Sequence, residues 1–245
     1  RLGLDLTEGG DAQKDAGEPR VVQALLGKPV IRVSAGFAHT GAIVAGGDLY
    51  MWGSAATGKC GLGTVTKKVE CYCSVPTKVI VGKSRTIRKL ACGAAHTAVV
   101  TDGGQLYVFG CGDGGRLGLG NREYKYDACY SPVLVEMLEH EHISSVTCGN
   151  STTLVTTEIK HVWKGEKTAR YRSLGGGLVY MAGSRNVLGR QCDNFELLDS
   201  MKEMPVKQIS AGFMHTSMVT ADGELYCFGR NNKVCCGSNP MLHFL

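Results

Sequence analysis

The fold follows from one stretch, Cys92-Gly-Ala-Ala-His96-Thr-Ala-Val-Val-Thr101-Asp-Gly-Gly104-Gln-Leu-Tyr-Val-Phe-Gly110. Residues 97–101 and 105–109 are short apolar runs rich in β-branched and aromatic side chains. The Asp-Gly-Gly sequence between them tolerates the positive φ angles of a tight turn, so the stretch predicts a β-hairpin. Residues 110–120, GCGDGGRLGLG, predict a loop, because each glycine costs about 1 kcal/mol relative to alanine inside a helix.

Copies of this stretch recur along the chain. The repeat positions are a leading glycine and, in three copies, a histidine three residues later: Gly36 and His39, Gly93 and His96, Gly149 (followed by Thr152), Gly212 and His215. The glycines are spaced by about 60 residues, a period typical of propellers and arrays in which each repeat is one supersecondary unit. The histidines recur with the repeat, so we interpret them as structural residues that bond neighbouring backbone.

Each repeat holds sequence for two further strands. Proline-containing segments 18–22, 75–79 and 131–135 precede the apolar runs 30–34, 87–92 and 143–148. Four strands per repeat make one propeller blade, and proline fits the start or the edge of a strand. The prediction is an all-β, incomplete β-propeller of four-stranded antiparallel blades, with blades at 18–53, 75–110, 131–183 and 197–229. Residues 1–17 and 230–245 are predicted connections to further blades.

The repeat unit Gly-x-x-His-[Ser/Thr], Leu-Tyr-x-[Phe/Trp]-Gly and Gly-x-Leu-Gly resembles that of the regulator of chromosome condensation family. The resemblance implies a seven-bladed propeller, so four repeats would be part of a larger protein. Arg1-Leu-Gly-Leu4 aligns with Arg116-Leu-Gly-Leu119, which places the start of the chain in the tail of another repeat. The third copy departs most, through Thr152 and an insertion at about 158–176, and we expect a distorted blade there.

Composition limits the class of protein. Hydrophobic residues make up 43% and charged residues 20%, which is ordinary for a soluble domain, and no apolar run is long enough for membrane insertion. The eleven cysteines are an odd number and form no paired Cys-x-x-Cys motifs. Buried, reduced thiols of a cytoplasmic or nuclear protein fit this pattern better than disulfides or a zinc site.

Two kinds of segment are candidate sites for a metal ion or a phosphate group. Glu139-His-Glu-His142 could offer two ligands on one face of a strand, but we favour an exposed polar turn and assign no metal. The glycine-rich segments 112–115 and 175–177 lack the strand, loop and helix context of a phosphate-binding loop. No catalytic arrangement stands apart from the repeat, so we predict neither an enzyme nor a cofactor.

Charge gives the candidate binding residues. Lys83, Arg85, Arg88 and Lys89 surround one short loop in a chain of net charge +5. They would form a positive patch that steers an acidic protein partner, the alternative being a solvated face. Aromatic residues are not interleaved with these charges, so base stacking is unsupported and nucleic acid or chromatin is the less favoured partner.

The resemblance implies two functions from different classes. The first is a non-catalytic scaffold propeller that binds proteins, as in ubiquitin ligases or other large assemblies. The second is guanine-nucleotide exchange on a small GTPase, with or without chromatin binding. Light sensing, known for a plant member of the family, needs clustered tryptophans, and only Trp52 and Trp163 are present.

Overall fold

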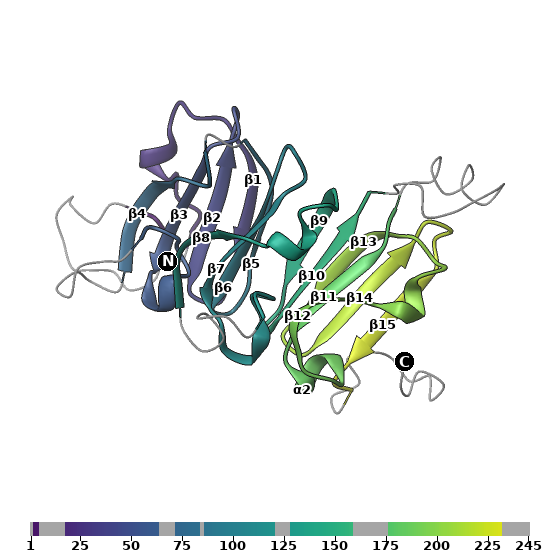
Figure 1. The fold of residues 1–245 in the computed structure, drawn as a ribbon. Coiled ribbons are helices and arrows are strands. Elements are labelled where there is room, and N and C mark those ends of the chain that lie inside the picture. The colour runs from purple at the N-terminus through teal and green to yellow at the C-terminus, as the bar shows by residue number, and fades with distance from the viewer. Residues whose placement is uncertain are drawn as a thin grey trace.

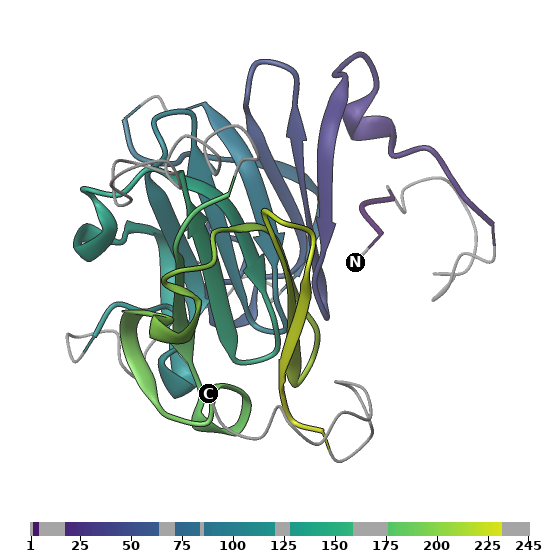
Figure 2. The ribbon, with the colours of Figure 1, turned by 90° about the vertical axis from the view of Figure 1, so that its right-hand side faces the viewer.

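The computed structural model is nearly all-β and describes residues 2–4, 18–63, 72–83, 86–120, 128–158 and 176–231. Its strands form four antiparallel sheets, three with four strands and the last with three among the described residues. Figure 1 shows the sheets in chain order from purple to yellow, and Figure 2 shows the yellow fourth sheet in front of the others. The predicted β-propeller fold is confirmed, as an arc of four blades in place of a closed ring.

The strands have the following bounds. The first sheet holds β1 (Val30–Ala35), β2 (His39–Val44), β3 (Leu49–Ser54) and β4 (Tyr72–Val79). The second holds β5 (Ile87–Cys92), β6 (His96–Thr101), β7 (Leu106–Cys111) and β8 (Ala128–Leu134). The third holds β9 (Ile143–Cys148), β10 (Thr152–Thr157), β11 (Val179–Gly183) and β12 (Cys192–Leu197). The fourth holds β13 (Val206–Ala211), β14 (His215–Thr220) and β15 (Leu225–Gly229).

Helical segments are short and lie between strands. They are η1 (Gln23–Leu25), η2 (Ala56–Gly58), η3 (Asp113–Gly115), η4 (Glu136–Leu138), α2 (Arg185–Leu188) and η5 (Asp199–Met201). No helix in the described part of the chain is long and apolar enough to span a membrane. The predicted loop over 110–120 is confirmed, since η3 is its only helical turn.

The predicted hairpins form the middle of every sheet. In the second sheet β6 pairs with β7 from His96 opposite Gly110 to Val100 opposite Leu106. Gly104 in the turn has a φ of +76°, which favours glycine. All residues of β6 are buried, because this strand lies inside a sheet that packs on both faces.

The proline-containing strands close the preceding sheet. β4 pairs with β3, with Val79 opposite Leu49, and β8 pairs with β7 in the same way. The predicted blade ranges are therefore wrong by one strand, because the sheets span 30–79, 87–134, 143–197 and 206–229. Residues 18–22 form no strand, and the described residues before them include no strand with which they could pair.

The third sheet is regular. Between β11 and β12 the register shifts between Met181 and Gly183, and the first two sheets shift between the equivalent residues of their third and fourth strands. The prediction of a distorted blade is wrong for this sheet, and residues 159–175 of the expected insertion lie outside the described residues. The chain differs between β11 and β12, where α2 replaces the glycine loop and ends at Gly189 with a φ of +74°.

The glycine loops pack on aromatic rings of the next sheet. Gly61 lies against Phe109 and Gly118 against Phe195, with no room for a Cβ atom at either glycine. Gly3 lies against Trp52 in the same manner, which supports the alignment of residues 1–4 with the tail of a repeat. The predicted connections at 5–17 and 232–245 lie outside the described residues.

Candidate functional site

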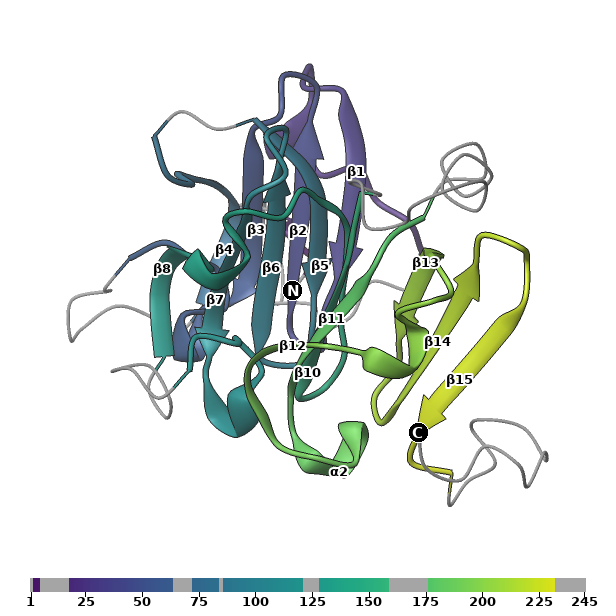
Figure 3. The ribbon, with the colours of Figure 1, turned by 45° about the vertical axis from the view of Figure 1, so that its right-hand side comes forward.

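The inner strands of the four sheets gather positive charge. β1, β5, β9 and β13 are the first strands of their sheets, and Figure 1 shows them in the middle of the molecule with β4 and β15 on opposite sides. Figure 3 also shows β5 beside β1. The sequences of these strands, VIRVSA, IRKLAC, ISSVTC and VKQISA, hold four basic residues and no acidic ones.

Three of these cations, Arg32, Arg88 and Lys89, lie on β1 and β5, which pack against each other. Arg32 and Lys89 occupy equivalent positions in their sheets. Each is the first paired residue after a register shift at the start of its strand, and they lie opposite Ile43 of β2 and Val100 of β6 respectively. Lys89 is half-buried, and its ammonium pKa is lowered by burial and then by the charges of Arg32 and Arg88. We call Arg32, Arg88 and Lys89 the cationic cluster.

The structure brings together only part of the predicted patch. Arg88 and Lys89 belong to the cationic cluster, Lys83 is exposed in the turn that follows β4, and Arg85 lies outside the described residues. Sequence reasoning missed Arg32, which joins the cluster from the preceding sheet. The repeat alignment could have identified it, because Arg32 is the counterpart of Lys89.

Nothing neutralises the cationic cluster within the described ranges. The ion pairs of the described residues are Lys78 with Asp48, His142 with Glu158, and Arg190 with Glu196. An open cleft of about 330 Å³ at the same end of the sheets is lined by the β2–β3 turn, the end of β4 and the start of β5. Gly46, Gly47 and Thr86 line this cleft, and the Lys78–Asp48 pair, 2.7 Å long, stands in its wall.

The repeated histidines join one sheet to the next. His39 Nε2 lies 2.8 Å from Thr97 Oγ1 of the second sheet, and His96 Nε2 lies 2.9 Å from Thr153 Oγ1 of the third. Thr97 donates in turn to the carbonyl oxygen of Lys59, so His39 is the donor to Thr97. Each of these two rings therefore binds a threonine hydroxyl of the next sheet, a partner that the sequence did not predict.

The glycine of each Gly-x-x-His unit makes room for the histidine ring. Cβ atoms built on Gly36, Gly93 and Gly212 would lie 2.5 to 2.6 Å from the Cε1 atom of the histidine in the same repeat. The backbone N–H groups of Phe37 and Ala94 then donate to Gly93 and Gly149 of the next sheet, at 3.2 and 3.1 Å. The glycine and histidine positions of the repeat therefore allow adjacent sheets to pack closely and to form hydrogen bonds with each other.

The joint between the third and fourth sheets lacks this bond. Thr152 stands in place of the histidine, and both Thr152 Oγ1 and Thr216 Oγ1 are buried without a hydrogen-bond partner among the described residues. Gly149 keeps the close approach to Gly212, so the sheets still pack as at the other joints. Thr147 Oγ1 accepts a bond from the Ala211 N–H at 3.0 Å across this joint.

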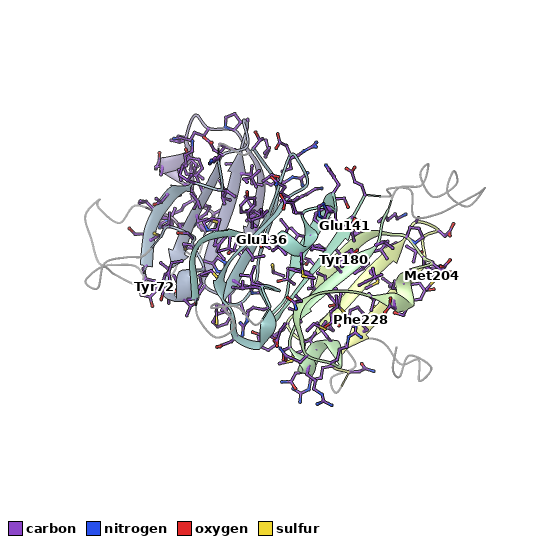
Figure 4. The ribbon with its side chains drawn as sticks, viewed as in Figure 1. Tyr72, Glu136, Glu141, Tyr180, Met204 and Phe228 are labelled. Carbon is purple, nitrogen blue, oxygen red and sulfur yellow. The ribbon has the colours of Figure 1, made fainter. Side chains whose placement is uncertain are left out.

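The Glu139–His142 segment, for which no metal was predicted, makes contacts with its own sheet and its neighbour. Glu141 accepts a bond from the Tyr180 hydroxyl at 3.1 Å, and the two side chains lie together in Figure 4. His142 packs on Gly104 and pairs with Glu158 at 3.2 Å, whereas His140 is exposed. Within the described ranges no three His, Cys, Asp or Glu side chains are placed to hold a metal.

The cysteines in the described part of the chain are free thiols. Cys60, Cys92 and Cys148 are buried, and burial raises the pKa of Cys60 and of Cys92 to about 12. A thiol held protonated in this way is a poor nucleophile and a poor metal ligand. These residues act as small apolar groups of the core.

Two family models described as the regulator of chromosome condensation (RCC1) repeat match the chain, one over residues 46–100 and 103–156, the other over 87–116 and 206–233. The chain belongs to the regulator of chromosome condensation repeat family. The RCC1 repeat at 46–100 runs from the β2–β3 turn to the end of β6, so it covers halves of two sheets. This offset explains why repeats in the sequence do not coincide with blades.

The chain is similar to parts of longer RCC1-type proteins. Human E3 ubiquitin-protein ligase HERC2 is 27% identical over 217 residues, which are 88% of this chain and 4% of that protein. The X-linked retinitis pigmentosa GTPase regulator of Canis lupus familiaris is 34% identical over 151 residues, 59% of this chain and 13% of that protein. The crystal structure of human WBSCR16 matches with a TM-score of 0.66 at 21% identity, over 85% of this chain and 49% of that chain. The chain spans less than half the length of each of these proteins.

Proposed function

We propose that this chain is a non-catalytic protein-interaction propeller of a larger cytoplasmic or nuclear protein. Its partner binds at the end of the sheets that carries the cationic cluster. The observation that carries this proposal is three cations on adjacent inner strands with no carboxylate paired to them in the described part of the chain. Repulsion between like charges held close together lowers the stability of the folded protein. An acidic partner would compensate for this repulsion.

The relatives support a role within a large assembly. The matched region is 4% of HERC2, which is a ubiquitin ligase, so the similarity is to a small part of a large protein. We favour a scaffold role for this chain within a ubiquitin ligase or a comparable large assembly.

A second candidate is guanine-nucleotide exchange on a small GTPase. It is favoured by the similarity to a protein named as a GTPase regulator. Exchange needs no covalent chemistry, because a surface that binds the nucleotide-free GTPase more tightly than the loaded form shifts the population toward release.

Affinity capture from cell extracts tests the proposal. The charge reversal Arg88→Glu should abolish capture of the partner, whereas Lys202→Glu, an exposed cation on the turn after η5, should not. Both variants should melt at the temperature of the wild type, which shows that the fold is intact. Equal capture by the two variants would exclude the cationic end as the binding face. A GTPase captured only without nucleotide and released by GTP would establish exchange as the function.

A further inference from the structure

At one equivalent position, the four inner strands carry a positive or a neutral polar residue. Following the register shifts, Arg32 corresponds to Lys89, then to Ser145 of β9 and to Gln208 of β13. Arg88, on the residue before Lys89, corresponds to Lys207. A ligand that follows these strands meets no negative side chain on them, since none of the four contains aspartate or glutamate.

We propose that the cationic cluster binds an extended acidic peptide segment of the partner, with carboxylates on Arg32 and Arg88 from two adjacent sheets. This inference rests on the proposed function and names the partner's chemistry. The site is composite, because neither sheet alone supplies both guanidinium groups. An extended segment with several carboxylates would bridge the joint between the first two sheets.

The side chains present favour carboxylates over nucleic acid. Arginine offers a planar fork that pairs with a carboxylate through two hydrogen bonds. The inner strands contain no phenylalanine, tyrosine or tryptophan on which a base could stack. Lys89 is half-buried, so a carboxylate reaching it is partly shielded from water and salt.

The cleft beside the cluster gives the segment a place to lie. Its wall includes Gly46 and Gly47 of the β2–β3 turn and Thr86 just before β5, none of which projects a long side chain. Thr86 and Arg88 are separated by a single residue along the chain, so a peptide in the cleft reaches the cluster directly. The only ion pair in the cleft wall, Lys78 with Asp48, is already satisfied.

The test uses the full chain and a fluorescein-labelled deca-glutamate peptide as probe, with binding followed by fluorescence anisotropy at two salt concentrations. Each of Arg32→Gln, Arg88→Gln and Lys89→Gln should weaken binding by about fivefold, the effect of losing one partly exposed ion pair. Lys202→Gln is the control and should leave the affinity unchanged, because Lys202 is an exposed cation on the turn after η5 and belongs neither to the cationic cluster nor to the cleft wall. Circular dichroism melting of each variant shows that the fold persists.

Two outcomes would overturn the inference. One is an equal loss of affinity in Lys202→Gln, which would mean that net charge alone attracts the probe. The other is tight binding of a single-stranded DNA oligonucleotide with no binding of deca-glutamate, which would assign the cluster to phosphate. If the cellular partner is still lost in Arg88→Glu while the probe fails to bind, the proposed function stands and only the acidic segment is refuted.

Discussion

His96 Nε2 lies 2.9 Å from Thr153 Oγ1, and this bond ties the second sheet to the third. Thr153 Oγ1 donates to the carbonyl oxygen of Arg116 at 2.6 Å, so its lone pair accepts from the imidazole N–H. The network therefore fixes the Nε2–H tautomer of a neutral ring. The same chain of bonds runs from His39 through Thr97 to Lys59, one sheet earlier.

Loss of this imidazole should weaken the joint. We expect His96→Ala to lower the free energy of unfolding by about 1–3 kcal/mol, because a buried hydroxyl loses its donor and the ring leaves a void. Urea denaturation at pH 7.5 measures the change. His140→Ala is the control, since His140 is exposed in the turn before β9 and should cost almost nothing. Equal losses in the two variants would refute a special role for His96.

The third joint allows the opposite experiment. Thr152→His should restore the missing bond to Thr216 and raise the free energy of unfolding by about 1 kcal/mol. Gly149 leaves room for the ring, as Gly93 does for His96. Thr152→Val is the control and should be at least as stable as the wild type, because it removes a buried hydroxyl that has no partner among the described residues. A histidine variant less stable than the wild type would show that the fourth sheet is placed differently.

Local sequence predicted the hairpins well and the sheets less well. The turn around Gly104 and the alternation of apolar residues determine a hairpin within a few residues. The strand that contains Pro132 could pair with the hairpin before or after it, and hydrogen bonds to β7 decide this only in the folded molecule.

The candidate site shows the same limit. Arg88 and Lys89 stood out because they are neighbours in sequence, whereas Arg32 comes from another repeat and joins them only through the packing of β1 on β5. The partner of each repeated histidine was missed for the same reason. Its hydroxyl belongs to the next sheet, one repeat and one residue further along the chain, and only the packing of the two sheets brings it to the ring.

Acid should destabilise the propeller through the buried histidines. Burial, and then the charge of Lys59, lowers the pKa of His39 to about 4, and burial followed by Arg116 and His39 lowers that of His96 to about 3. In the unfolded chain these histidines bind protons near pH 6.5, whereas in the folded state they bind them only at about pH 4 or below. Stability is therefore complete above about pH 6.5 and falls as the pH drops, by up to about 1.4 kcal/mol per pH unit for each histidine.

Urea denaturation between pH 7.5 and pH 5 measures this dependence. The double variant with His39→Gln and His96→Gln should be less stable at pH 7.5 but should change much less with pH. If wild type and double variant lose stability in parallel, other groups cause the acid sensitivity and the two rings are not held neutral.

The cationic cluster can be examined without a partner through the titration of Lys89. Its pKa is lowered by burial and then by Arg32 and Arg88, so removal of either arginine charge should raise it. We expect Arg32→Gln to shift the titration of the Lys89 side chain, followed by NMR of selectively labelled lysine, toward higher pH. Arg190→Gln, which removes a cation paired with Glu196 on the third sheet, should leave the Lys89 titration in place. An unchanged titration in Arg32→Gln would mean that β1 and β5 do not bring these charges together in solution, and the composite site would then have no basis.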